Sequence, residues 1–497
     1  MNESKPESPA QIHAGHWLNG NSAETQLAQG LTAYLALDDA FMSIASRVHL
    51  IRNAQRSIDL QYYIWKDDYI GHMMLQELLK AADRGVKVRL LIDDQNGTQL
   101  DSVLKPLAAH PNFEIKLFNP YKFRKLRAID YAFRFKHINH RMHNKLIIAD
   151  GAIAVTGGRN ISREYFDASD SFQFTDLDIL FYGTAVQQAN AVFIDFWNDD
   201  LSYAVPQLLG AGAKPDLDSL RKAYALDAVQ KNKVENKIEF AQQQLDASLK
   251  HRAFNWAPAH FVADSPDKIR GQASGQQLIY NQMLRIMGEP KQHIELVSAY
   301  FVPTRRGTDY LASLAQNRIK VRVLTNSLAS NDAPIAHAGY ARHRPQLLAM
   351  GVELYEMHSE LPGVLRGALG VSGSMGNHSA GVVGSQGGSR AMLHSKLLIV
   401  DGRLLAVGSM NLDMRSQRQN TEVALLIRST ELSRRATTQI DAVLKESAWQ
   451  VQATDQGLRW RAPEGSGLPD ATTEPDASAP LRLMLQLLGP LAPDHLL

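Results

Sequence analysis

The residues best suited to chemistry lie in a pattern that occurs twice along the 497-residue chain. Residues 143–150 read HNKLIIAD and residues 394–401 read HSKLLIVD, so both carry His-x-Lys-x-x-x-x-Asp. An asparagine follows each histidine at the same distance, at the end of a turn of small residues: Asn160 in GGRN and Asn411 in GSMN. Two copies with matched spacing indicate a duplicated half-site.

These residue types suit the transfer of a phosphorus-centred group. One neutral imidazole can attack phosphorus and hold it covalently. The second imidazole can give a proton to the leaving oxygen and then take one from the incoming nucleophile. Alternate residues of a strand share a face, so His143 and Lys145 should point into one pocket, as should His394 and Lys396. The lysines and the two asparagines would stabilise the developing negative charge, so we expect no metal and no cofactor.

Carboxylates and a hydroxyl near the turns are candidates for support. A carboxylate that accepts the Nδ1 proton of each histidine would fix its tautomer and leave Nε2 facing phosphorus. Asp178 and Glu422 lie on the strands that follow the two turns, and Asp176 competes with Asp178 for the first position. Ser409, in the second turn, is a further candidate for phosphate contact or support.

The elements that must position these residues repeat one order of strand, helix and strand. The first half shows it at 57–65, 71–85 and 86–94, and the second half at 293–302, 308–317 and 319–327. Such alternation predicts an α/β fold with parallel-rich sheets. We expect two similar halves related by pseudo-two-fold symmetry, with one active site shared at their interface.

Composition divides the chain further. We predict an N-terminal extension (1–36), a first half (37–220), a helical insertion (221–257), a second half (258–460) with a Gly-rich loop (363–390), a disordered linker (461–480) and an apolar C-terminal tail (481–497). The insertion is assigned because 221–256 lacks Gly and Pro, and the linker because Pro, Gly and acidic residues dominate it. The Gly-rich loop could be either a functional loop or a tolerated insertion.

The two repeated patterns resemble the HKD motifs of the phospholipase D superfamily. The likeness extends to QYYIWKDD (61–68), RGVKVRLLIDD (84–94), INHRMHNK (138–145), GGRNI (157–161), YFVPTRRG (300–307), LTNSLASND (324–332) and HAGYARHR (337–344). Together these segments resemble the C-type group of bacterial cardiolipin synthases, which lack transmembrane helices. The resemblance covers roughly residues 40–460 and the C-terminal tail. It implies that Asp150 and Asp401 are structural residues that bind nearby backbone.

The same resemblance implies a reaction. A phosphatidyl group would pass to phosphatidylglycerol, from phosphatidylglycerol or phosphatidylethanolamine, through a phosphatidyl-histidine on His143. Two alternatives stay open: hydrolysis of phospholipids with water as acceptor, and cleavage of nucleic-acid phosphodiesters, although we do not expect a nucleic-acid partner. A lipid-binding scaffold without activity is a third class, and two intact motifs argue against it.

Phospholipid substrates require contact with a membrane surface. The net charge is +2, the N-terminus has no apolar core, and no window reaches the ~18–20 apolar residues of a membrane span. A basic amphipathic run, 121–137, contains Arg124, Lys125 and Arg127, and the tail offers Leu485 and Leu488. Such elements suit an anionic lipid surface. We expect peripheral binding to the bacterial inner membrane, on the cytoplasmic side; the sequence leaves the oligomeric state open.

Overall fold

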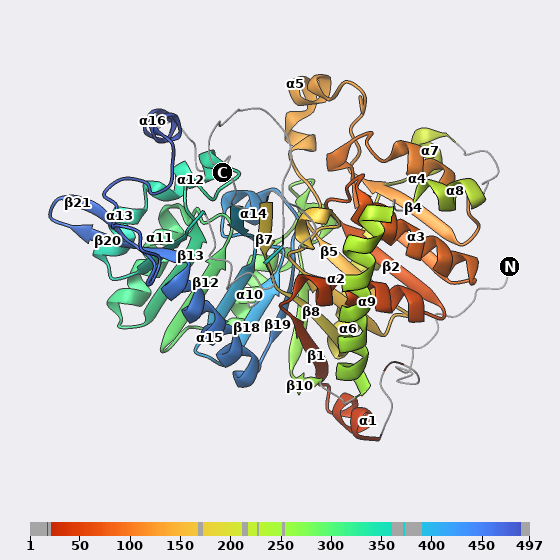
Figure 1. The fold of residues 1–497 in the computed structure, drawn as a ribbon, viewed down its shortest axis with the longest axis horizontal. Coiled ribbons are helices and arrows are strands. Elements are labelled where there is room, and N and C mark those ends of the chain that lie inside the picture. The colour runs from red at the N-terminus through yellow and green to blue at the C-terminus, as the bar shows by residue number, and fades with distance from the viewer. Residues whose placement is uncertain are drawn as a thin grey trace.

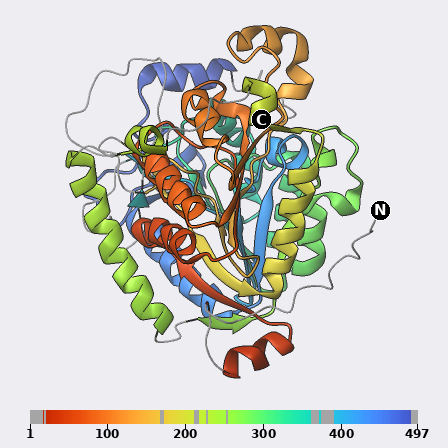
Figure 2. The same cartoon turned by 90° about the vertical axis from the view of Figure 1, so that its right-hand side faces the viewer.

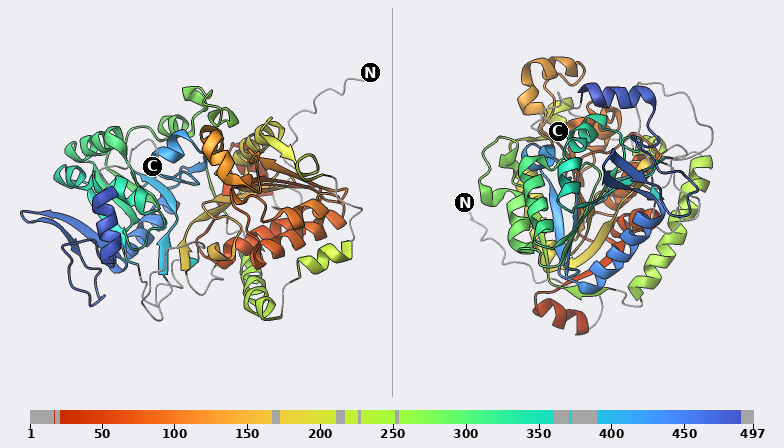
Figure 3. Two further views of the ribbon diagram at one scale, coloured as in Figure 1. Left: turned by 90° about the horizontal axis from the view of Figure 1, so that it is seen from above. Right: turned by 90° about the vertical axis from the view of Figure 1, so that its left-hand side faces the viewer.

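The computed structural model describes residues 17, 21–166, 172–210, 217–225, 228–250, 254–359, 371–372 and 390–488. Within these residues the chain forms two nine-stranded sheets, one in each half (Figure 1). Seen from above, the two halves lie side by side, with the first in red to yellow and the second in green to blue (Figure 3). The predicted α/β organisation in two similar halves is confirmed.

The first sheet combines parallel strands with antiparallel hairpins. Its strands are β1 (Thr32–Leu37), β2 (Ser57–Tyr62), β3 (Lys87–Asp93), β4 (Phe113–Phe118), β5 (Lys145–Ala149), β6 (Ile153–Gly157), β8 (Asp178–Gly183), β9 (Ser202–Ala204) and β10 (Asn255–Ala257). They lie in the order β10-β1-β8-β6-β5-β2-β3-β4-β9. β2, β3 and β4 are parallel because α3 (Tyr69–Asp83) and α4 (Asp101–Leu107) carry the chain back between them.

The second sheet repeats this plan. Its strands are β11 (Ala259–Ala263), β12 (His293–Ser298), β13 (Lys320–Asn326), β14 (Glu353–Met357), β17 (Lys396–Val400), β18 (Leu404–Gly408), β19 (Val423–Ile427), β20 (Ala448–Thr454) and β21 (Gly457–Arg461). The order is β11-β19-β18-β17-β12-β13-β14-β20-β21, so β17 occupies the place that β5 has in the first sheet. A small third sheet of β7 (Phe172–Thr175), β15 (Val371–Ser372) and β16 (Arg390–Leu393) joins the two halves.

Helices cover the sheets. The remaining α-helices are α1 (Asn21–Ala28), α2 (Ala40–Asn53), α5 (Arg127–Ile138), α6 (Thr184–Asn198), α7 (Val205–Leu209), α8 (Leu217–Ala223), α9 (Ala228–Lys250), α10 (Ile279–Met287), α11 (Thr304–Gln316), α12 (Pro334–Ala341), α13 (Arg344–Ala349), α14 (Met414–Arg418), α15 (Thr430–Glu446) and α16 (Ala479–Leu488). Side chains of Asp39, Asp68 and Ser429 accept backbone N–H groups and so start α2, α3 and α15. Among the described helices, none is long and apolar enough to cross a bilayer.

A shared hydrophobic core joins the halves. Phe181 on β8 stacks on Phe261 on β11, with ring centroids 6.1 Å apart. The same cluster of buried side chains includes Phe193 on α6, Leu425 on β19 and Ile440 on α15. Because this core draws on both sheets, the seam between the halves is packed like a protein interior and can hold groups from both halves in fixed positions.

Two of the predicted boundaries differ from the structure at the ends of the first half. Residues 1–36 were assigned to an extension, but β1 pairs with β8 and belongs to the first sheet. Residues 221–257 were assigned to a helical insertion, but β10 at its end pairs with β1. The helical part is split into α8 and α9, and α9 lies along the flank of the first half beside α2 (Figure 2).

The segment 461–480 also differs from its prediction, which was a disordered linker. Ala471 pairs with Trp460, and Asp470 accepts hydrogen bonds from Arg459 and from the backbone of Ala462. The buried carboxylate of Glu474 pairs with Arg344, and its contacts with His337 and Arg344 hold the pKa of Glu474 below its usual value despite its burial. A few specific ion pairs order a segment whose composition lacks a hydrophobic pattern. The Gly-rich loop, apart from Val371–Ser372 and Arg390, lies outside the described residues.

Candidate active site

The segment before each motif histidine is held by the opposite half. The backbone N–H of His143 donates to the carbonyl of Thr421, and Thr421 donates back to Arg141. In the second half, β16 ends at Leu393, directly before His394, and pairs in parallel with β7 of the first half. The segment that precedes each catalytic strand, β5 or β17, therefore contacts the opposite half of the chain before the strand joins its own sheet.

In each half, the last residue of the second parallel strand, β3 or β13, binds the segment just before the motif histidine. Asp93, the last residue of β3, accepts the backbone N–H of Met142 at 2.8 Å and pairs with the buried Arg141 at 3.0 Å. Asn326, the last residue of β13, accepts the N–H of Leu393 at 2.9 Å. The sequence interpretation missed both residues. Their matched positions at the ends of corresponding strands were the available signal.

The orienting carboxylates are exchanged between the halves. Nδ1 of His143 lies 2.8 Å from Oε2 of Glu422, which belongs to the second half. Nδ1 of His394 lies 2.7 Å from Oδ2 of Asp176, which belongs to the first half. A carboxylate accepts a proton, so each contact places the proton on Nδ1 and leaves Nε2 as a base. The site is thus completed only when the two halves meet.

Asp178, the residue predicted to orient the first histidine, has another role. It is fully buried and pairs with Arg47 at 3.0 Å, and it accepts a hydrogen bond from Ser43 at 2.5 Å. Asp178 begins β8, whereas Asp176 precedes the strand and is free to turn toward the seam. The competitor, Asp176, does orient a motif histidine, but it orients His394 and not the first one. Glu422, which was expected to orient His394, orients His143 instead, so each carboxylate serves the other half.

The two carboxylates are supported differently. Oε2 of Glu422 also accepts the hydroxyl of Ser409 at 2.5 Å, so Ser409 positions Glu422. Gly158 takes the corresponding place in the first turn, and a Cβ there would come within 2.3 Å of Asp176. The shorter Asp176 side chain can reach His394 because this glycine lets the two segments approach closely.

The two motif lysines are buried beside the histidines. Lys145 Nζ donates to the carbonyl of His143, and Lys396 Nζ donates to the carbonyl of His394. Burial lowers the pKa of Lys145 to about 7 and that of Lys396 to about 8, although Glu422 and Asp176 oppose the shift. An anionic phosphate placed between the lysines would favour their charged form.

The histidines are kept neutral. Burial, followed by the charges of Lys145 and Lys396, holds the pKa of His143 and of His394 well below its usual value. Burial raises the pKa of Glu422 to about 7, and the positive charge of Lys145 opposes that rise. A neutral imidazole beside an ionised carboxylate is the form that can attack phosphorus or accept a proton.

The asparagines of the two turns are buried at the same site. Asn160 accepts the backbone N–H of Ile64 at 3.2 Å and donates to the hydroxyl of Tyr165 at 2.9 Å. Asn411 is 5% exposed, and among the described residues its Oδ1 has no hydrogen-bond partner. A buried polar atom of this kind is available for a ligand at the site.

The motif aspartates lie at the other ends of the catalytic strands. Asp150 accepts backbone N–H groups of Gln55, Arg56 and Ser57, at 2.7 to 3.1 Å. Asp401 accepts the equivalent groups of residues 291–293 at 2.8 to 3.1 Å. These contacts lock the turn after each catalytic strand to the start of the neighbouring strand. The structural role that the resemblance implied matches these contacts.

Aromatic side chains that sequence reasoning missed line the histidines. The ring of Tyr63 meets His143 edge-on at 4.8 Å, and the ring of Tyr165 meets His394 edge-on at 5.0 Å. Such contacts fix the imidazole planes without adding charge. Tyr63 immediately follows β2, and this position at the end of a strand was the only sequence signal.

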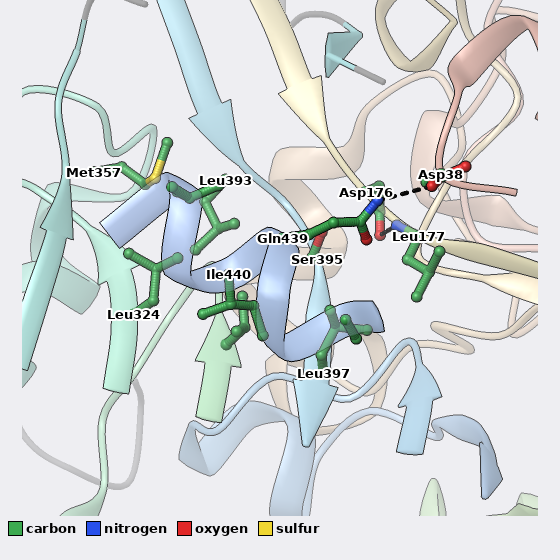
Figure 4. A pocket seen from close by; sticks show the side chains of 13 residues that line it. Asp38, Asp176, Leu177, Leu324, Met357, Leu393, Ser395, Leu397, Gln439 and Ile440 are labelled. Carbon is green, nitrogen blue, oxygen red and sulfur yellow. Dashed lines mark hydrogen bonds between the residues drawn. The ribbon is translucent and has the colours of Figure 1, made fainter. Parts of the chain in front are cut away.

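An apolar pocket lies behind β17. Leu393, Ser395 and Leu397 face it (Figure 4). The alternate residues His394 and Lys396 belong to the catalytic site. The pocket encloses about 630 Å³ of empty space, including its mouth. Gln439 donates to Asp38 at 2.9 Å across that mouth. The pocket therefore lies against the catalytic strand, and Asp176, which orients His394, is one of its lining residues.

The basic run 121–137 is only partly available to a membrane. Arg124, predicted to bind lipid, has a side chain that is 10% exposed and pairs with Asp94 and Asp101, so that prediction is wrong. Arg127 is half-buried and stacks on Tyr121, with 4.4 Å from Cζ to the ring centroid.

Apart from Lys125, the exposed side chains of the basic run and of the tail are not the ones predicted to bind lipid. Lys125 is exposed, and so are Leu126 and Phe133, the latter 84% exposed. In the tail, Leu485 is half-buried, and the side chain of Leu488 lies outside the described residues.

One further cluster has the geometry of a cation site. His337, Glu356 and Glu474 are buried, and their ligand atoms lie within 4.8 Å of one another. The guanidinium of Arg344 pairs with both carboxylates, so it already supplies the positive charge of this cluster. We assign the cluster to packing between β14 and the 461–480 segment.

Comparison with known proteins agrees with this architecture. The family described as "Cardiolipin synthase, PLD-like domain" matches residues 48–197 and 283–444. The chain is 35% identical to cardiolipin synthase C of Escherichia coli (strain K12), over 94% of this chain and 97% of that protein. It is 33% identical to an uncharacterized protein of Helicobacter pylori (strain ATCC 700392 / 26695), over 91% and 87%.

A solved structure shows the same fold at low sequence identity. The phosphatidylserine synthase of Haemophilus influenzae Rd KW20 covers 96% of this chain and 99% of its own, with a TM-score of 0.58 and 14% identity. Two motif-bearing halves, a seam that exchanges carboxylates, and matches over nearly the whole chain lead to one assignment. The chain belongs to the cardiolipin synthase family of proteins with phospholipase-D-like domains.

Proposed function

We propose that the protein is a cardiolipin synthase that transfers a phosphatidyl group to phosphatidylglycerol. One observation carries the proposal: His143 and His394, each with its own lysine and an orienting carboxylate from the other half, meet at one seam. One neutral imidazole can act as the nucleophile, and the second, once it is protonated on Nε2, can act as the acid and afterwards as the base within a single cycle.

The reaction runs in two steps. In the first, Nε2 of His143 attacks the donor phosphorus and the P–O bond to the head-group alcohol breaks. His394 takes up a proton on Nε2 when the anionic phosphate binds beside it, and gives that proton to the leaving alcohol. In the second, a hydroxyl of phosphatidylglycerol attacks phosphorus, the P–N bond breaks, and its proton passes to His394. The two lysines stabilise the charge on the phosphate oxygens in both steps.

The donor is the finer part of the proposal. Phosphatidylglycerol and phosphatidylethanolamine both present a phosphodiester to the two motif histidines and the two motif lysines. Purified protein should therefore form cardiolipin in vesicles of phosphatidylglycerol, with and without phosphatidylethanolamine, and mass spectrometry of the products would identify the donor. Phosphatidic acid as the sole product would support hydrolysis instead, and inert vesicles with cleaved plasmid would support a nuclease.

His143→Ala and His394→Ala provide the internal control. Each variant should lose turnover, because each imidazole serves a different step. Full activity in either variant would refute a shared site.

We further propose that the active site meets the bilayer through one apolar face. This membrane-facing surface consists of side chains that are 43 to 84% exposed: Leu126 just before α5, Phe133 and Phe135 on α5, Ile335 on α12, and Leu483 and Leu487 on α16. α5 and α16 both lie at the top of the molecule in Figure 1 and in Figure 2.

Two contacts connect this surface to the site. Asn139, at the end of α5, donates to Gln419 and accepts from Arg415. Both partners follow the turn of the second motif, and His143 lies four residues after Asn139 in the chain. α12, against which α16 packs, begins two residues after Asp332, whose charge acts on Lys396. The apolar side chains thus flank the site from both halves.

A bilayer partner fits the chemistry of this surface, because exposed apolar side chains are accompanied by Lys122, Lys125 and Lys136. Phe133→Ser should weaken flotation with phosphatidylglycerol vesicles by about tenfold, since it removes burial worth roughly 1.5–3 kcal/mol. Phe240→Ser is the matched control, because Phe240 is 64% exposed but lies on α9, on the flank. Equal flotation of both variants would refute this surface. The cytoplasmic side of the inner membrane stays a prediction, which protease accessibility in spheroplasts would test.

A further inference from the structure

A hydrogen-bonded pair of polar side chains breaks the symmetry of the site. Tyr300 Oη donates to Oδ1 of Asp332 at 2.6 Å. Tyr300 follows β12, and Asp332 lies in the loop between β13 and α12, so both belong to the second half. In the first half, Ile64 takes the position that corresponds to Tyr300, because Trp65 pairs with Ile161 as Phe301 pairs with Leu412.

This pair lies on the His394 side of the site. The Asp332 carboxylate interacts electrostatically with Lys396, with Tyr300 and with Tyr165. Tyr165 in turn holds its ring 5.0 Å from His394. Asp332 is exposed to solvent, so its carboxylate is accessible to a small molecule.

A carboxylate here is poorly suited to bind phosphate, which it repels. Burial and the Asp332 charge raise the pKa of Tyr300 well above its usual value, so the phenol keeps its proton and donates it to Asp332. The pair then offers lone pairs of the phenol oxygen and of the carboxylate, and no free proton. It should therefore select groups that donate hydrogen bonds, such as alcohol hydroxyls.

We propose that Tyr300 and Asp332 form the head-group site that binds the glycerol hydroxyls of phosphatidylglycerol. The inference rests on the proposed transfer reaction and names which side of the site receives the alcohol. In a displacement at phosphorus, the nucleophile and the alcohol lie on opposite sides. A hydroxyl-binding pair beside His394 places the alcohol there, so His394 handles the alcohol proton and His143 forms the bond to phosphorus.

The chemistry of the acceptor step then balances. The alcohol oxygen bonds to phosphorus while the P–N bond to His143 breaks, and the hydroxyl proton moves to Nε2 of His394. A second hydroxyl of the same glycerol donates to Asp332. An alcohol that lacks the additional hydroxyls can still attack phosphorus, but it makes no hydrogen bond to Asp332.

Competition between two soluble acceptors tests the proposal. Full-length protein is incubated with phosphatidylglycerol vesicles and equal concentrations of deuterated glycerol and 1-propanol, which lacks the two additional hydroxyls. Mass spectrometry then compares labelled phosphatidylglycerol with phosphatidylpropanol. We expect the parent to favour glycerol, and Asp332→Asn to lower that preference by about tenfold, as the loss of one hydrogen bond to a charged acceptor predicts. Tyr300→Phe should lower it less, because it leaves the carboxylate in place.

Asp455→Asn is the control, since Asp455 is an exposed carboxylate in the turn between β20 and β21. Thermal unfolding of all variants separates loss of fold from loss of preference. Parent protein that forms neither product would overturn the transfer reaction and the head-group site together. Parent protein that forms both products, with the same ratio in Asp332→Asn, would overturn the head-group site alone.

Discussion

Exchange of Glu422 for glutamine gives the sharpest test of the crossed pairing. Oε2 of Glu422 receives two hydrogen bonds, from His143 Nδ1 at 2.8 Å and from Ser409 at 2.5 Å, and the side chain is fully buried. Glutamine keeps the shape and removes the charge. The expected loss is about 2 kcal/mol, or about 30-fold in rate, for the charge-assisted bond to His143 alone.

A larger loss follows if the amide changes the tautomer. When the glutamine –NH2 group donates to Nδ1, the ring proton moves to Nε2, which then has no lone pair for phosphorus. In the His–carboxylate pair of a protease, the wrong histidine tautomer lowers kcat by about 10⁴-fold. The expected range for Glu422→Gln is therefore about 30-fold to about 10⁴-fold in the step that forms the phosphatidyl-histidine.

The assay uses phosphatidyl-p-nitrophenol, whose leaving group needs no proton, so release of the phenolate reports the attack by the nucleophile alone. Parent protein should give a burst followed by slower turnover. Glu422→Gln should slow the burst, because it disables His143. Asp176→Asn should keep the burst and slow the turnover that follows, because it disables His394 as the base for the acceptor.

Glu431→Gln controls for loss of charge at the surface, since its side chain is 63% exposed and pairs only with Arg434 among the described residues. A burst that survives in Glu422→Gln and disappears in Asp176→Asn would refute the assignment and make His394 the nucleophile. Parent-like kinetics in both variants would refute any orienting role for the two carboxylates.

Three further predictions concern pH, metal and stability. The pH profile of kcat/KM should be a narrow bell. Activity falls below about pH 7 as Glu422 (pKa about 7) gains a proton, and falls above about pH 7 as Lys145 (pKa about 7) and then Lys396 (pKa about 8) lose theirs; a flat profile from about pH 5 to about pH 9 would contradict these shifts. Activity should persist in excess chelator, because Lys145 and Lys396 supply the positive field; loss that a divalent ion restores would indicate a metal-dependent step. Asp150→Ala should lower the free energy of unfolding by roughly 3 kcal/mol, since three backbone donors lose a charged acceptor, and an unchanged melting temperature would contradict the structural role of this aspartate.

The sequence predicts the reacting groups and the fold class because both depend on local patterns. A strand places alternate residues on one face, so the pattern His-x-Lys by itself aims both side chains at one pocket. The alternation of strands and helices, repeated in both halves, predicts two similar α/β units. Asp150 and Asp401 end their strands in the left-handed region, before a glycine, and this local geometry aims their carboxylates at the neighbouring backbone.

The tertiary structure decides the partners, because these come from segments that are distant in the chain. Asp176 and Asp178 are equivalent by alternation. The register of β8 buries Asp178 against Arg47 and leaves Asp176, before the strand, to reach His394. Arg124 belongs to a basic run in the sequence, yet Asp94 and Asp101 neutralise it after folding. A titratable group is oriented or neutralised by what lies within a few ångströms, and only the packing of the two halves at their seam brings those groups together.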